Sequence, residues 1–191
     1  MKPQVSGTTE EEDTLLALHI VEGIIDFTLP GVDGKQHSYA DYHDQSILVL
    51  IFSCNHCPYV RAWEDRMIAI QQDYADKGVQ LIAINANDAS KYPDDSFEQM
   101  QQRATEKGFN FPYLHDETQQ VAQAFAAQRT PEVFVFDQQR RLRFHGAIDD
   151  HFEDPEKVNN HYLRQTLDAL LAGETPAIQE TNPVGCTIKW K

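Results

Sequence analysis

An apolar run followed at once by two cysteines is the feature that most constrains this sequence. Residues 47–52 are consecutive apolar residues, a composition typical of a strand buried on both faces. Cys54 and Cys57 follow with C-x-x-C spacing, and Pro58 suits the first position of a helix. Helical spacing of apolar residues continues to about Lys77, and Gly78 can end the helix. We therefore predict a buried strand, a short thiol loop and a helix, in that order.

The position of Pro58 indicates which thiol is the nucleophile. If the helix begins at Pro58, Cys57 is its N-cap, where unpaired N–H groups and the helix dipole favour a thiolate. A helix that began directly after Cys54 would exchange the two roles, but Pro58 argues against that start. We predict Cys57 as the nucleophile. Cys54 is the nearest resolving thiol, and Cys186 in the C-terminal tail is the alternative.

Charge and cysteine content exclude several classes of function. The chain has 191 residues, with 16 Lys and Arg against 30 Asp and Glu, so its net charge of −14 argues against nucleic acid or an anionic membrane as a partner. Three cysteines are too few for a disulfide framework and indicate redox or metal chemistry in a reducing compartment. Residues 1–13 are polar and end in an acidic run, so they do not resemble a signal peptide, and the apolar segment 15–21 is too short to cross a bilayer. We expect a cytoplasmic protein.

The rest of the chain alternates strands and helices, as in an α/β protein. The Asp33-Gly34 pair predicts a hairpin turn. The predicted strands are residues 24–30, 79–86, 111–114, 132–137 and 141–147, and the predicted helices are 96–107, 117–127 and one capped by Asp154 that runs to about Leu171. The strand–helix–strand order of residues 47–86 predicts a parallel, right-handed unit, and the short link after residue 137 predicts an antiparallel pair.

The predicted organisation is one domain with two extensions. Residues 1–13 are expected to be disordered, residues 14–174 to form the domain, and residues 175–191 to be a tail packed on it. Ile188 and Trp190 alternate in this tail as an edge strand would.

Six short motifs then point to a family. They are IDFTLP (25–30), CNHCPYVR (54–61), AINAND (83–88), FPYLHDET (111–118), GAIDD (146–150) and GCTIKWK (185–191). Together they resemble the peroxiredoxin-like subgroup of the thioredoxin family, within the redoxin superfamily of alkyl hydroperoxide reductases and thiol-specific antioxidants. The resemblance covers about residues 22–191. It implies a thioredoxin-like α/β fold, with a central mixed sheet, flanking helices, an N-terminal hairpin and a C-terminal extension.

The resemblance also bears on the thiols. It implies Cys57 as the reactive cysteine, which follows Phe52 by five residues as in thioredoxin-like reductases and precedes Pro58 as in peroxiredoxins. Val60 stands where the usual resolving cysteine would be, and Cys54 stands where the peroxidatic motif has threonine. The sequence thus departs from the usual form of both motifs.

Residues near the second informative loop have roles implied by the same resemblance. Pro131, preceded by Thr130, matches the cis-proline that presents backbone groups to an extended substrate in thioredoxin-like proteins. Arg129 either lies near Cys57 and lowers its pKa or is a solvated surface side chain. His56, inside the thiol loop, either supports the thiolate and its proton transfers or is simply solvated.

These observations predict a thiol–disulfide oxidoreductase that acts on a substrate protein or a small thiol, with a dithiol electron donor and no organic cofactor. A thiol-dependent peroxidase, with antioxidant activity and Cys57 attacking peroxide, is the alternative in the same chemistry. A metal-binding protein or an adaptor on a redox fold is the alternative of another class, because Cys54, His56 and Cys57 form a compact cluster. No second C-x-x-C and no regularly spaced histidine pair accompanies that cluster, so we predict no bound metal.

Overall fold

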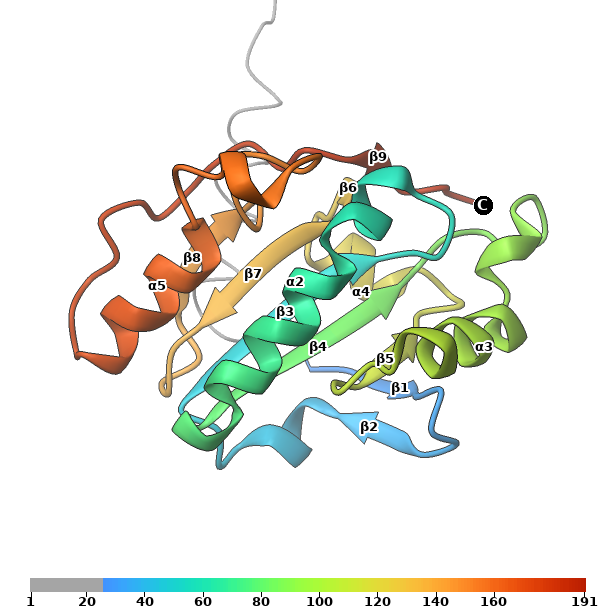
Figure 1. The fold of residues 1–191 in the computed structure, drawn as a ribbon. Helices are drawn as coiled ribbons and strands as arrows, with labels where there is room; N and C mark the ends of the chain where they lie inside the picture. Colours follow the sequence, from blue (N-terminus) through green and yellow to red (C-terminus); the bar gives the residue numbers. More distant parts are fainter. Residues whose placement is uncertain (1–25) are drawn as a thin grey trace, which may run out of the picture.

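A five-stranded mixed sheet is the centre of the fold in the computed structural model, which describes residues 26–191 (Figure 1). Its strand order is β5-β4-β3-β7-β8. The strands are β3 (Ile47–Ser53), β4 (Val79–Asn85), β5 (Tyr113–His115), β7 (Glu132–Phe136) and β8 (Leu142–Gly146). Strands β3, β4 and β5 are parallel, while β7 is antiparallel to both β3 and β8. The predicted parallel unit and antiparallel pair are confirmed.

Strand β3 is buried along its whole length because helices and loops cover both faces of the sheet. Alternate residues Ile47, Val49 and Ile51 contact the core under α2 (Pro58–Tyr74), α3 (Phe97–Lys107) and α5 (Tyr162–Leu171). Leu48, Leu50 and Phe52 contact the core on the opposite face, under α4 (Gln120–Ala124) and the N-terminal hairpin. Figure 1 shows α2, α3 and α5 together in front of the sheet and α4 behind it.

The N-terminal hairpin consists of β1 (Thr28–Pro30) and β2 (Gln36–Ser38), which pair antiparallel as predicted. A short 3-10 helix, η1 (Tyr39–Tyr42), follows it. The expectations for residues 1–13, for the segment 15–21 and for the start of the first strand at residues 24–25 lie outside the described residues. Within residues 26–191, no helix is long and apolar enough to cross a membrane.

The C-terminal end of α2 and both ends of α3 follow the local sequence signals closely. Helix α2 continues into the 3-10 helix η2 (Ala75–Lys77), and the chain turns at Gly78, whose φ is 77°. Helix α3 begins after its N-cap Ser96, whose hydroxyl accepts a hydrogen bond from the N–H of Gln99, and ends at Gly108 with φ 67°.

Two predicted helices begin later than the sequence indicated. Helix α4 starts at Gln120 rather than at residue 117, because Gln119 adopts a left-handed conformation with φ 65°. It also ends at Ala124 rather than at residue 127, and Ala126 has a φ of 51°. Asp154 caps only a 3-10 turn, η4 (Pro155–Lys157), and α5 starts at Tyr162. The Asp150 carboxylate accepts hydrogen bonds from the backbone N–H groups of residues 159 and 160 and holds this stretch as a loop.

The C-terminal segment crosses the edge of the sheet where the thiols lie. Its strand β9 (Cys186–Thr187) pairs antiparallel with β6 (Arg129–Thr130), so the strand lies just before the Ile188–Trp190 stretch that the alternation indicated. Ile188 is buried and Trp190 is 40% exposed, so these two residues do not share a face. Figure 1 shows this segment running past the N-terminal end of α2.

Candidate active site

Cys57 occupies the junction between the central strand and its helix. Strand β3 ends at Ser53 and α2 begins at Pro58, which places Cys57 at the N-cap with extended backbone angles, φ −70° and ψ 123°. The predicted helix start is confirmed, and Pro58 is at the first helical position. The Cys57 side chain is 0% exposed. Its sulfur is therefore held in a closed environment at the positive end of the helix.

The groups around the Cys57 sulfur favour its thiolate. A hydrogen bond from the Cys54 thiol is the largest influence, burial opposes it, and the Cys186 thiol and the backbone N–H groups of Val60 and Cys186 add further donors. Together they lower the pKa of Cys57 to about 4. The Cys57 sulfur also lies 3.2 Å from the Thr130 carbonyl oxygen, which accepts the proton of the neutral thiol. The site can thus hold either protonation state but favours the charged one.

Cys54 is the proton donor of the pair. Its hydrogen bond to Cys57, its burial and the charge of Asp95 all raise the pKa of Cys54. The Cys54 sulfur also lies 3.3 Å from the Thr130 hydroxyl oxygen. Opposite shifts on Cys54 and Cys57 assign the proton to the former and the negative charge to the latter.

Cys186 comes to the site from the far end of the chain. Strand β9 holds its sulfur 2.8 Å from that of Cys57. Burial, followed by the hydrogen bond to Cys57, raises the pKa of Cys186 to about 11. The structure therefore places both candidate resolving thiols, Cys54 and Cys186, against Cys57.

Asp95 fixes the thiol loop, a role that the sequence analysis did not assign. It lies at the end of the 3-10 helix η3 (Pro93–Asp95), and its side chain is 0% exposed. One carboxylate oxygen accepts hydrogen bonds from the Asn55 N–H at 2.6 Å and the Asn85 amide at 3.3 Å. The other accepts from His56 Nδ1 at 2.5 Å and the Asn87 amide at 2.9 Å. The available signal was the polar loop directly after β4, because β3 and β4 are parallel and end at the same edge.

His56 is held rather than solvated. Besides its contact with Asp95, its ring stacks on Tyr92 with centroids 5.4 Å apart. His56 therefore lies in the thiol loop in a fixed orientation, where it reinforces the link between that loop and η3.

Thr130 and Pro131 lie across from the thiols. Their peptide bond is cis, and Thr130 contacts Cys57 through its carbonyl and Cys54 through its hydroxyl. Arg129 was expected either near Cys57 or on the surface. Its side chain is exposed, and its Nη1 donates a hydrogen bond to the Gly185 carbonyl at 3.0 Å. Its charge lowers the pKa of Cys186 against the stronger opposing influences.

Comparison with known proteins gives the family. The AhpC/TSA family model matches residues 20–145. The chain belongs to this family. A crystal structure of an uncharacterized conserved protein from Geobacillus kaustophilus is 40% identical to this AhpC/TSA protein, with a TM-score of 0.83 over 87% of this chain and 89% of that one.

Two further relatives extend the comparison. Thiol-disulfide oxidoreductase ResA of Geobacillus thermodenitrificans (strain NG80-2) is 23% identical over 120 residues, which are 62% of this chain and 63% of the relative's length. A thiol:disulfide interchange protein of the thioredoxin family from Chlorobium tepidum TLS is 20% identical, with a TM-score of 0.54 over 63% of this chain and 81% of that one. The fold of this AhpC/TSA protein is thioredoxin-like.

A possible metal cluster is part of the same network. Cys54, His56 and Asp95 each have a ligand atom within 4.8 Å of the others. Both oxygens of Asp95 already accept two N–H donors each, as described above. A cation would have to replace these hydrogen bonds, so the cluster fits a hydrogen-bonded network better than a metal site.

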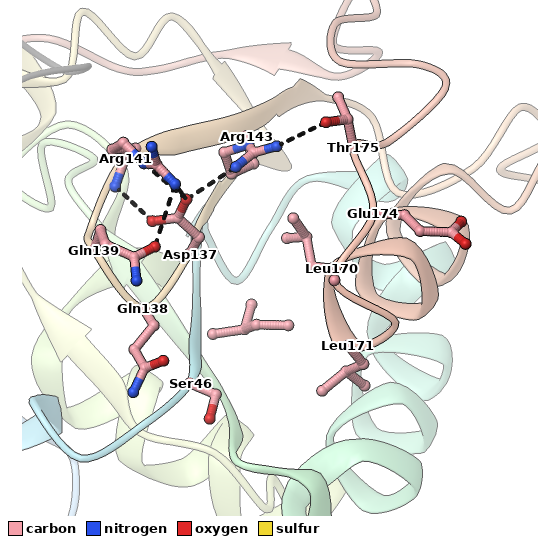
Figure 2. Close-up of a pocket in the computed structure, with 12 residues that line it drawn as sticks. Ser46, Asp137, Gln138, Gln139, Arg141, Arg143, Leu170, Leu171, Glu174 and Thr175 are labelled. Carbon is pink, nitrogen blue, oxygen red and sulfur yellow. Dashed lines mark hydrogen bonds and ion pairs between the residues drawn. The ribbon is translucent and has the colours of Figure 1, made fainter.

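A surface pocket of about 450 Å³ lies at the other end of the sheet, between the β7–β8 turn and the end of α5 (Figure 2). Ile47, the first residue of β3, lines this pocket. At the ordinary rise of a strand, Ile47 lies roughly 20 Å from Ser53, the last residue of β3. Arg141 and Arg143 border it, but both pair with Asp137, as the dashed lines in Figure 2 show. The single Asp137 carboxylate is therefore shared by the two guanidinium groups.

Proposed function

We propose that this protein is a thiol–disulfide oxidoreductase with Cys57 as its nucleophile. The observation that carries the proposal is the set of donors around the Cys57 sulfur, which lowers its pKa to about 4. A thiolate is the form that attacks disulfides, and it is also a good leaving group when the enzyme is reduced again. The substrate is a disulfide of a protein or a small molecule. No organic cofactor is needed, because thiols carry both electrons.

The reaction has two exchange steps. The Cys57 thiolate attacks one sulfur of the substrate disulfide and releases the other as a thiolate. A second cysteine of the protein then attacks the Cys57 sulfur, releases the remaining substrate thiolate and leaves an internal disulfide. An external dithiol reduces this disulfide and is itself oxidised. Cys54 and Cys186 are both close enough to Cys57 to serve as the second thiol.

Thionitrobenzoate release from 5,5′-dithiobis(2-nitrobenzoate) tests the nucleophile. We expect Cys57→Ser to lose the fast phase, by roughly a hundredfold or more, because neither remaining thiol is activated. Cys54→Ser is the matched variant and keeps a fast release, since Cys57 retains its helix position and the serine hydroxyl can still donate a hydrogen bond in place of the Cys54 thiol. A fast phase that survives Cys57→Ser and disappears in Cys54→Ser would assign the nucleophile to Cys54 instead. A physiological role that survives Cys57→Ser would indicate an adaptor.

Peroxidase chemistry is the second candidate, favoured by membership in the AhpC/TSA family. Here the Cys57 thiolate attacks one oxygen of a peroxide, becomes a sulfenic acid and releases alkoxide or hydroxide. A second thiol then condenses with the sulfenic acid, giving a disulfide and water. Comparing the rates with which hydrogen peroxide and a small disulfide oxidise the reduced protein separates the two activities. The cytoplasmic location stays a prediction from the sequence.

A further inference from the structure

The strand edge next to the thiols is already occupied. An extended polypeptide commonly binds a protein by adding a strand to an open edge. Residues Arg129 and Thr130 form such an edge beside Cys57. The chain's own strand β9 pairs with it antiparallel, with Arg129 opposite Thr187 and Thr130 opposite Cys186. This register brings the Cys186 thiol to the nucleophile.

The segment around β9 is anchored by further contacts. The N–H of Ile188 donates to the Gln128 carbonyl at 2.9 Å, and the Ile188 side chain is buried in the core under α4. The N–H of Lys189 donates to the side-chain oxygen of Asn87 at 2.8 Å. These contacts fix the residues that follow β9 to the residue before β6 and to the loop after β4.

Gly185 permits the close approach of the two strands. A Cβ at this position would lie 2.1 Å from the Thr130 carbonyl oxygen and 2.6 Å from its carbonyl carbon. These are backbone atoms, which cannot move aside as the end of a long side chain can. The Gly185 carbonyl also accepts the hydrogen bond from Arg129. Glycine is required here by contact with the opposite strand.

The thiols of Cys57 and Cys186 differ in solvent exposure. Cys57 is fully buried, whereas Cys186 is partly exposed. The reactive sulfur thus lies beneath the segment that carries its partner.

We propose that the C-terminal segment 185–189 is a tethered substrate mimic, which occupies the strand edge of Thr130 and presents Cys186 as the thiol that resolves the mixed disulfide on Cys57. The inference rests on the proposed function and names the resolving thiol and the substrate class. While β9 is paired with β6, the substrates of the protein are small disulfides, because an extended polypeptide would need the strand edge that β9 fills.

The steps balance in atoms and electrons. Cys57 in its thiolate form attacks a small disulfide, forming a mixed disulfide and releasing one substrate thiolate. Cys186 loses its proton to water and attacks the Cys57 sulfur, which releases the second substrate thiolate. The substrate gains two electrons, and Cys57 and Cys186 are oxidised to one disulfide. An external dithiol returns the two electrons.

The two steps are ordered by charge. While Cys57 is a thiolate, its hydrogen bond and its negative charge both raise the pKa of Cys186. The mixed disulfide has no such charge, so these two influences disappear after the first step and Cys186 becomes easier to ionise. Cys186 is therefore activated when it is needed.

Disulfide mapping of the unaltered protein is the first test. The reduced protein is treated with one equivalent of 5,5′-dithiobis(2-nitrobenzoate), digested under acid and analysed by mass spectrometry. We expect a Cys57–Cys186 bridge and two equivalents of thionitrobenzoate. Cys186→Ser should slow the release of the second equivalent relative to the first by at least roughly tenfold, because it removes a thiol that has a high effective concentration beside Cys57. A Cys54–Cys57 bridge as the first product, with undiminished second release in Cys186→Ser, overturns the proposal.

Displacing β9 tests the substrate class. Gly185→Ala should increase the dithiothreitol-dependent reduction of insulin, relative to that of 5,5′-dithiobis(2-nitrobenzoate), by roughly fivefold or more, because it frees the strand edge. Val184→Ala is the control, since Val184 is exposed and lies just outside the paired residues. An unchanged ratio in Gly185→Ala overturns the proposal. Loss of the fast phase of release in Cys57→Ser tests the proposed function separately, so the two can fail independently.

Discussion

Replacing Asp95 by asparagine keeps the size of this side chain but removes its charge and one of its two acceptor oxygens. Asp95 is fully buried and accepts four hydrogen bonds, two at each oxygen. An asparagine amide turned toward either pair leaves two buried donors unsatisfied, at about 1–3 kcal/mol each. We therefore expect the free energy of unfolding to fall by about 2–6 kcal/mol, the cost of two such unsatisfied donors.

Urea denaturation of the reduced protein measures this change. A loss of that size lowers the thermal midpoint by roughly 10 °C for a chain of this length. Asp94→Asn is the matched control, because the Asp94 side chain is exposed and its carbonyl, which accepts from the Asn55 amide, remains. Equal stabilities of the two variants, or a loss below about 1 kcal/mol for Asp95→Asn, would refute the idea that this carboxylate holds the thiol loop.

Two further predictions concern ionisation and helix packing. Because the pKa of Cys57 is lowered to about 4, the thiolate persists as pH falls and is lost only near that value. The rate of thionitrobenzoate release should therefore vary little from pH 8 to pH 6 in stopped-flow measurements, and a tenfold fall per pH unit there would contradict the shift. Arg103→Met should lower the free energy of unfolding by about 3 kcal/mol, because it leaves the Glu64 carboxylate, 1% exposed, without its partner. Lys107→Met is the control on the same helix pair, since its partner Asp65 is 79% exposed, and equal effects of the two in urea denaturation would argue against burial as the cause.

The comparison of Glu64 with Asp65 shows a limit of the sequence. The two acidic residues are neighbours in the second turn of α2, and nothing local distinguishes them. Glu64 faces α3 and pairs with Arg103 in the interior, while Asp65 is largely exposed. Which side of a helix is covered depends on the packing of other elements, so only the tertiary structure could tell them apart.

The sequence by itself determined the elements that depend on neighbouring residues. The buried strand, the helix start at Pro58 and the N-cap position of Cys57 all follow from an apolar run, a proline and their spacing, because helix and strand starts are local. The later start of α5 was not visible, because Asp150 binds a loop that lies further along the chain.

The tertiary structure alone decided which groups meet at the nucleophile. Cys186 reaches Cys57 across 129 residues, and Asp95 reaches His56 across 39. These contacts depend on how β9 pairs with β6 and on the loop that follows β4. Local sequence signals extend over a few residues, whereas strand pairing and loop packing are set by the fold as a whole.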